Sequence, residues 1–153
     1  MTAVNHSIMG SIIMVSVANP VIGLPLAFAS HFILDALPHF GAHTVAKPGS
    51  KEFNSILQTD AFLTACFLII GTFAGYRAGL PLWLVPVGGT LGWIPDVMWY
   101  KHYQNDINGE DKHWDIVRKA HKKIQRYELS WGWIVESVWF IASVALLSRL
   151  IFM

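Results

Sequence analysis

The chain contains very little cysteine and very little charge. Cys66 is the only cysteine among 153 residues, so an internal disulfide framework and a zinc site built from cysteines are both excluded. Its position in an apolar run is typical of a free thiol that packs as a small hydrophobic side chain. Charged residues make up only 14% of the chain, whereas soluble domains contain about a quarter. This low charge argues against a water-soluble globule.

The net charge is also close to zero. Eleven Lys and Arg residues balance ten Asp and Glu residues, which leaves a formal charge of +1 and no overall field that would attract nucleic acid. No Lys or Arg precedes Lys47, so the first apolar run lacks the basic region of a secretory signal. The chain also has no Gly-x-Ser-x-Gly elbow, phosphate loop or dinucleotide-binding fingerprint. Nucleic-acid binding and these three common enzyme chemistries are therefore not expected.

Hydrophobic residues are abundant, at 54% of the chain with a mean hydropathy of +0.44. A helix needs about 20 mostly apolar residues to span the hydrocarbon core of a bilayer. The sequence predicts an all-α fold, a polytopic helical membrane protein formed by a single domain over residues 1–153. The predicted membrane segments are about 4–18, 21–40, 60–76, 81–100 and 131–152.

The first long apolar stretch is interrupted by Asn19-Pro20. Proline ends or kinks a helix, and Asn-Pro favours a turn. We therefore expect an N-terminal helical hairpin formed by the first two segments, followed by three further transmembrane helices. A single kinked span is the alternative, since proline is tolerated in membrane helices.

Most of the positive charge lies between the last two predicted spans. Apolar residues recur at helical spacing there, which predicts an amphipathic surface helix over residues 111–127, with a solvated connector as the alternative. In the hairpin arrangement, the N-terminus and the loops 41–58 and 101–129 share one side of the membrane. Nine of the eleven Lys and Arg residues lie in those loops. The positive-inside rule makes that side cytoplasmic, with the N-terminus and the basic loop inside.

Histidine and aspartate residues gather at this same side. His31, Asp35 and His39 follow one another at four-residue steps, which places them along one face of a helix. Imidazole and carboxylate groups at this spacing can hold a divalent cation, and the mixture suits Zn, Mn or Fe, with one or two ions. The predicted metal ligands are His6, His31, Asp35, His39, Asp60 and Asp96, and the predicted catalytic residues are Asp96 and His121.

Each of these residues also has a structural interpretation. Asp60 and Asp96 could cap helix N-termini, where a carboxylate accepts backbone N–H bonds. His6 and His121 could lie at the membrane interface, because imidazole has an apolar body and a polar tip. The His31, Asp35 and His39 stripe could be an interhelical hydrogen-bond network without a metal.

Three short motifs resemble those of a known family. Asn5-His6-Ser7-Ile8-Met9-Gly10, Ser30-His31-Phe32-Ile33-Leu34-Asp35 and Gly92-Trp93-Ile94-Pro95-Asp96 are similar to motifs of the predicted membrane-bound metal-dependent hydrolases, a group that includes LexA-regulated inner-membrane proteins. The resemblance implies a small helical membrane fold, a location in the bacterial inner membrane and phosphoester hydrolysis. Two family elements, Pro-Asp-x-Asp and His-Arg-x-x-Thr-His-Ser, are absent, and the motif order differs.

The leading hypothesis is a divalent-metal-dependent membrane hydrolase that acts on a phosphoester or lipid-linked substrate at the cytoplasmic headgroup region. A bound cation would activate water, and the basic helix with His121 would attract an anionic headgroup. The alternative is a non-enzymatic membrane protein, a metal or proton permease component or an assembly factor, that uses the same stripe of His and Asp side chains.

Overall fold

The protein is described here by a computed structural model that covers residues 1–17, 19–97 and 123–153. These residues form helices and two very short strands, which confirms the all-α prediction. The helices are α1 (Ala3–Ser16), α2 (Pro20–Asp35), the short 3-10 helix η1 (Ala42–Thr44), α3 (Lys51–Arg77), α4 (Leu84–Trp93) and α7 (Trp133–Phe152). The strands are β1 (His39–Phe40) and β2 (Glu128–Leu129).

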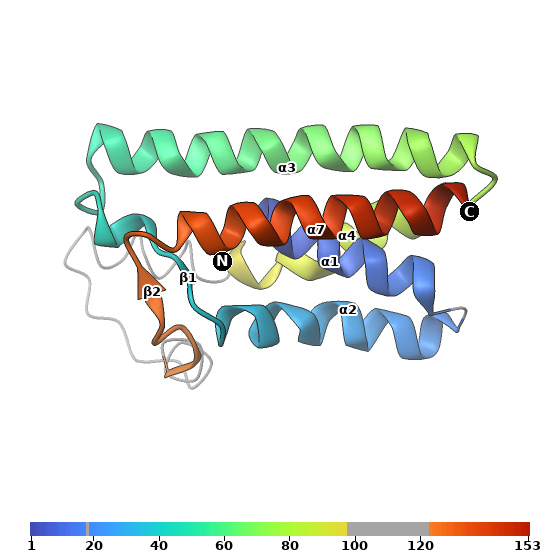
Figure 1. The fold of residues 1–153 in the computed structure, drawn as a ribbon, viewed down its shortest axis with the longest axis horizontal. Helices are drawn as coiled ribbons and strands as arrows, with labels where there is room; N and C mark the ends of the chain where they lie inside the picture. Colours follow the sequence, from blue (N-terminus) through green and yellow to red (C-terminus); the bar gives the residue numbers. More distant parts are fainter. Residues whose placement is uncertain (18, 98–122) are drawn as a thin grey trace.

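The N-terminal segment is a helical hairpin, as the sequence predicted. The side chain of Asn19 accepts a hydrogen bond from the backbone N–H of Val21 at 2.9 Å, and Pro20 occupies the first helical position of α2. α1 ends at Ser16, and Asn19 and Pro20 start α2 in the reverse direction, so the two helices lie side by side and antiparallel (Figure 1). The interpretation as one kinked span is therefore wrong.

Several predicted boundaries differ from the structure. α3 begins at Lys51, where the hydroxyl of Ser50 caps the N–H of Phe53, so Asp60 lies inside this helix and not at its start. α2 ends at Asp35 because the chain turns into β1, and α4 ends at Trp93 before a further helical stretch at 95–97. The predicted surface helix at 111–127 falls almost entirely outside the described residues.

Helix α1 occupies the centre of the helical layer and packs against α2, α3, α4 and α7. Its contact with α4 is very close, because glycines face each other across it. A Cβ atom on Gly10 would overlap the carbonyl oxygen of Gly88, and a Cβ atom on Gly92 would overlap the carbonyl oxygen of His6. Small residues allow helix backbones to approach in this way. The approach fixes His6 of α1 against the C-terminal end of α4.

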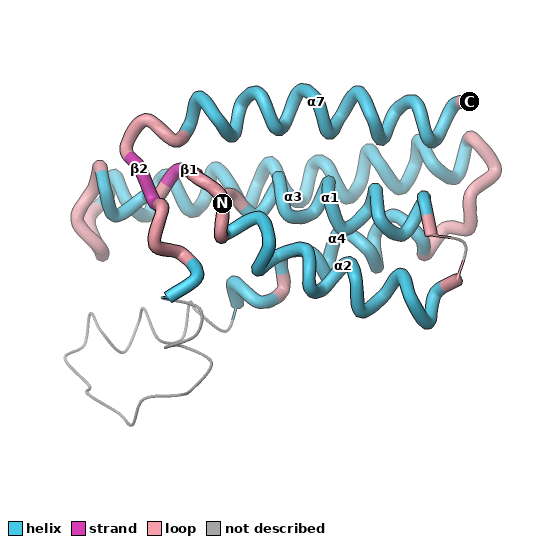
Figure 2. The backbone as a smooth tube through the Cα atoms, turned by 60° about the horizontal axis from the view of Figure 1, so that its bottom comes forward, coloured by secondary structure: helices cyan, strands magenta, loops and turns pink. Residues whose placement is uncertain are grey.

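The connections gather at the two ends of the molecule. The strands β1 and β2 lie at one end, where they pair in parallel with His39 opposite Glu128 (Figure 1). The C-terminus and the links from α1 to α2 and from α3 to α4 lie at the other end (Figure 2). This grouping agrees with the hairpin arrangement expected from the sequence.

Polar side chains are buried inside this fold and large apolar side chains are exposed on it. The buried residues include His6, His31, Asp35, His39 and Glu136, whereas Ile69, Ile70 and Ile141 are each about two thirds exposed or more. Among the described residues, α3 and α7 are long and apolar enough to cross a membrane, and their most apolar windows are only 6% and 22% buried. Helix faces with many large exposed apolar side chains are typical of surfaces that contact a partner or a lipid phase.

The close contact between α1 and α4 predicts that Gly10→Ala will be strongly destabilising. The added methyl would meet backbone of α4, which cannot rotate away, so the two helices must separate. Overpacking of this kind typically costs about 1–3 kcal/mol, which thermal unfolding in detergent would detect as a lower Tm. Gly71→Ala is the matched control, because its Cβ would meet side-chain carbons of Val85 at 3.3 Å that can shift. Equal Tm values for the two variants would contradict the prediction.

Candidate metal centre

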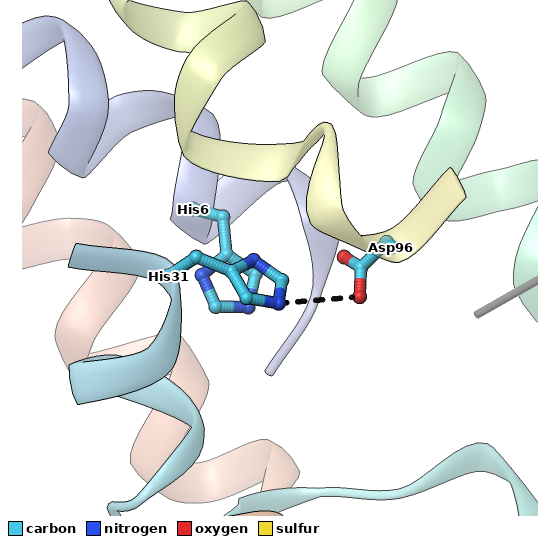
Figure 3. A group of neighbouring side chains, drawn as sticks. All are labelled: His6, His31 and Asp96. Carbon is cyan, nitrogen blue, oxygen red and sulfur yellow. Dashed lines mark ion pairs between the residues drawn. The ribbon is translucent and has the colours of Figure 1, made fainter. Parts of the chain in front are cut away.

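Three helical segments bring His6, His31 and Asp96 together (Figure 3). His6 comes from α1, His31 from α2, and Asp96 from the turn of helix that follows α4. One ligand atom of each residue lies within 4.8 Å of the other two, and the two imidazole rings stack with their centroids 4.1 Å apart. The structure thus joins three of the predicted ligands from distant parts of the sequence, and the group could hold a metal ion.

The hydrogen bonding of His31 determines which nitrogen faces this group. Nδ1 lies 3.0 Å from the carbonyl oxygen of Gly92, which can only accept, so the proton of the neutral ring is on Nδ1. Nε2 then carries a lone pair, and it lies 3.2 Å from Asp35 Oδ2 and 3.7 Å from Asp96 Oδ1. A histidine that ligates a metal usually donates its other N–H to a carbonyl or carboxylate in this way.

Asp35 is the fourth member of this cluster and is fully buried. Its Oδ1 accepts hydrogen bonds from His6 Nε2 at 3.0 Å and from the amino group of Met1 at 2.6 Å, while Oδ2 accepts from Gln125 Nε2 at 3.0 Å. His6 Nδ1 is buried and has no hydrogen-bond partner among the described residues. Because a buried carboxylate costs several kcal/mol unless it is compensated, these donors, and the charged amino group of Met1 above all, stabilise Asp35 in its buried position.

Asp60 is placed outside this cluster. Its Oδ2 accepts from the backbone N–H of Ala3 at 2.7 Å, and its Oδ1 accepts from that of Val4 at 3.1 Å. Both carboxylate oxygens therefore cap the N-terminus of α1. The capping interpretation was right about the chemistry, but the capped helix is α1, not the helix that contains Asp60.

His39 is also separated from the cluster, because α2 ends at Asp35 and the four-residue helical step does not continue. Its Nδ1 lies 2.7 Å from the carbonyl oxygen of Leu37, and its Nε2 lies 3.9 Å from Glu128 Oε1. Burial lowers the pKa of His39 below its usual value, so the ring is neutral at pH 7. Nε2 of His43 lies 3.5 Å from Oε2 of Glu128.

One predicted site residue, His121, is still to be placed, and two residues that were not predicted, Gln125 and Glu136, contact the segments around the site. His121, a predicted catalytic residue, lies outside the described residues. Gln125 contacts Asp35 and was not predicted, since a single amide in a basic segment gives no signal. Glu136 was not among the predicted site residues, although it interrupts the last apolar run of the sequence. An ionisable residue within such a run is a signal for a functional or structural role.

Glu136 connects α7 to two distant segments. Its Oε2 accepts from the backbone N–H of Thr2 at 3.0 Å, from the Thr2 hydroxyl and from Asn5 Nδ2 at 3.2 Å. Its Oε1 accepts from the backbone N–H of Phe40 at 2.9 Å. This one carboxylate fixes the start of α1 and the strand β1 to α7, and thereby holds His6 in place.

A cavity of about 780 Å³ lies beside the cluster. Asp96, Met1 and Gln125 form part of its wall, and the rest is mostly apolar and includes one face of α3. His6, His31 and Asp35 are fully buried, whereas the Asp96 side chain is 29% exposed. Among the described members of the cluster, Asp96 is therefore the one that a molecule in the cavity can contact.

Comparison with known proteins adds no relative: no protein-family model, curated protein or solved structure matches the chain. The function must therefore be argued from the residues of this site.

The contacts of Glu136 predict that Glu136→Gln will reduce stability. Both oxygens of Glu136 now accept hydrogen bonds from the protein. In glutamine an NH2 group replaces one of these oxygens, so a donor would face another donor, such as the backbone N–H of Phe40 or of Thr2. A buried donor without an acceptor costs about 1–3 kcal/mol, which thermal unfolding in detergent would detect. Glu52→Gln is the control, because Glu52 is exposed at the start of α3 and bonds only locally, to Ser50 and the backbone there, so its Tm should fall less than that of Glu136→Gln. An unchanged Tm for Glu136→Gln would show that these bonds contribute little.

Proposed function

We propose that the protein is a divalent-metal-dependent membrane hydrolase whose metal is held by His6, His31, Asp35 and Asp96. The observation that carries this proposal is that His6, His31 and Asp96 offer ligand atoms within 4.8 Å of one another, while Nδ1 of His31 is held by the carbonyl oxygen of Gly92. Two imidazoles and two carboxylates suit Zn, Mn or Fe better than Ca or Mg. Three of these residues are buried and would fix the ion in place.

The resemblance described above supports the same group of residues. Its first motif contains His6, its second contains His31 and Asp35, and its third contains Gly92 and Asp96. The structure brings these three motifs into contact through α1, α2 and the end of α4. A resemblance whose motifs converge on one site favours metal-dependent hydrolysis of a phosphoester over a role for each motif in helix packing.

The proposed chemistry gives Asp96 a second role besides holding the metal, because a carboxylate has two oxygens. A divalent cation at this site would lower the pKa of a bound water and polarise an ester oxygen. Asp96 is the partly exposed carboxylate at the cavity wall, so it can orient the water and accept its proton. His6, His31 and Asp35 hold their positions through buried contacts and do not reach the cavity. His121 remains a predicted contact for an anionic headgroup.

The membrane arrangement follows from the exposed apolar faces. α3 is about 40 Å long at 1.5 Å per residue, enough to span a bilayer, and α7 is about 30 Å long. The shorter helices α1, α2 and α4 would complete a polytopic bundle in the bacterial inner membrane. The positive-inside rule would then place the metal centre at cytoplasmic headgroup depth, with membrane lipid or a lipid-linked phosphoester as substrate.

The metal proposal predicts near-stoichiometric Zn, Mn or Fe in protein purified without chelator or nickel resin, measured by inductively coupled plasma mass spectrometry. His31→Ala/Asp35→Ala should lose at least about nine tenths of the metal, because it removes an imidazole and the central carboxylate. Asp60→Asn is the control: it changes a neighbouring half-buried carboxylate whose two oxygens cap α1, and it should retain the metal.

Activity would then be measured on the metal-loaded protein with a chromogenic phosphodiester. Asp96→Asn should lower kcat by about 10²–10⁴-fold, the usual contribution of a general base. Metal binding without turnover in the unmodified protein would instead favour the permease or assembly role. No metal in any variant, even after incubation with excess ions, would refute the metallohydrolase.

The membrane orientation predicts opposite accessibility of the two ends of α3. With Cys66 replaced by serine, a cysteine at Lys51 should react with a membrane-impermeant maleimide in inside-out vesicles only. A cysteine at Arg77 should react in intact spheroplasts only, because the helix carries the two positions to opposite faces. Labelling of both positions from the same side would exclude a membrane-spanning α3.

A further inference from the structure

The cavity beside the metal centre has a polar part and an apolar part. Asp96, Gln125 and Met1 belong to the polar part, next to the cluster. Apolar residues on the wall include Ala61, Ala65 and Leu68 of α3 and Trp93 of α4, and α3 also contributes Asn54, Gln58, Asp60 and Thr64 to the lining. Ligand sites commonly have 300–1,000 Å³ of space and an apolar wall with a few polar groups. A volume of about 780 Å³ is far larger than a water molecule or an inorganic phosphate requires.

The α3 residues on this wall lie on one face of the helix. Phe53, Leu57, Ala61, Ala65 and Leu68 follow one another at steps of three or four residues. At 1.5 Å per residue the row is about 22 Å long. One leaflet of a bilayer has a hydrocarbon depth of about 15 Å, half of the 30 Å core. The stretch from Ala61 to Leu68 covers about 10 Å of this row, so it can contact part of an alkyl chain that reaches through one leaflet.

Two of these residues are alanines that leave open space on a helix otherwise rich in large side chains. Ala61 and Ala65 are exposed in the structure although they line the cavity, whereas Phe62, Ile69 and Ile70 project from α3 without lining it. The wall at 61–65 is thus open on the cavity side. Among the described residues, α3 is also one of the two helices long and apolar enough to span a membrane, and apolar residues such as Ile69 and Ile70 are exposed on it beyond the cavity.

We propose that this cavity holds one alkyl chain of an amphipathic phosphoester substrate, with the chain against Ala61, Ala65 and Leu68 and the phosphoester beside Asp96. The inference rests on the proposed function, because the metal centre defines where the ester lies. It adds a specificity that the metal centre alone does not have: the protein selects substrates that carry a long chain. Asp96 and the apolar row of α3 belong to one continuous cavity, and this continuity carries the inference.

The test compares two substrates that share the reacting phosphodiester, ethyl para-nitrophenyl phosphate and hexadecyl para-nitrophenyl phosphate. In the unmodified protein kcat/KM should be much higher for the hexadecyl ester. Ala65→Trp fills the apolar part, and should reduce that preference at least about tenfold, since each methylene excluded from an apolar site weakens binding about fourfold. Hydrolysis of the ethyl ester should fall far less than that of the hexadecyl ester, and the metal content should not change. Ala145→Trp, on the exposed surface of α7, is the size-matched control and should keep the full preference.

A second measurement does not depend on turnover. Hexadecyl phosphate with a diazirine near the end of its chain should, on illumination, label the α3 peptide that contains residues 61–68. Excess unlabelled hexadecyl phosphate should suppress this labelling, while labelling of the outward residues Ile69 and Phe73 should resist competition.

The outcomes separate the two proposals. An unchanged chain-length preference in Ala65→Trp, or the absence of competable labelling at 61–68, would overturn the chain site and leave the metal centre and ethyl-ester hydrolysis intact. Competable labelling at 61–68 without hydrolysis of either ester would support the chain site and refute the hydrolase.

Discussion

A buried carboxylate sets the main constraint on this structure. Asp35 lies among helices with no access to solvent, and its two oxygens meet the imidazoles of His6 and His31, the amide of Gln125 and the amino group of Met1. An isolated charge at such a position is strongly unfavourable, so every neighbouring segment has to supply a donor or a cation. The start of α1, the end of α2 and the segment before β2 all converge on this one side chain.

The convergence depends on helices that approach closely. Gly10, Gly88 and Gly92 remove the side chains that would keep α1 and α4 apart, so the backbone of His6 lies against Gly92. The Gly92 carbonyl is then within reach of His31, and it fixes the protonated nitrogen of that ring. Packing of small residues thus orients the ring of a candidate ligand. Two further carboxylates complete the frame, since Asp60 caps α1 and Glu136 ties the start of α1 and β1 to α7.

The distribution of polarity follows from the same arrangement. Carboxylates, imidazoles and hydroxyls occupy the interior around α1, while the outer faces of α2, α3 and α7 carry isoleucine, phenylalanine and leucine. A fold of this kind suits an apolar environment, where the hydrophobic effect gives no reason to bury apolar side chains. The cavity beside Asp96 joins both kinds of surface, which is the property that a site for an amphipathic molecule requires.

The sequence by itself determined the all-α class and the hairpin at Asn19-Pro20, and it singled out His6, His31, Asp35 and Asp96 as candidate ligands. These follow from local properties: apolar runs long enough for helices, a turn that only proline chemistry explains, and ionisable side chains where charge is costly. The sequence did not predict where α3 begins. Its first turns, between Lys51 and Thr59, are polar and carry no continuous apolar pattern.

Only the tertiary structure decided which of the six predicted ligands meet. His39 appeared to continue the stripe of His31 and Asp35, but the helix ends at Asp35 and the turn directs His39 toward Glu128. Asp60 appeared equivalent to Asp96, but the N-terminus of α1 lies against it and takes both of its oxygens. Periodicity places residues on a face of one helix. The partner of a carboxylate depends on which helix packs against that face, and the side-chain volumes along several distant segments determine this together.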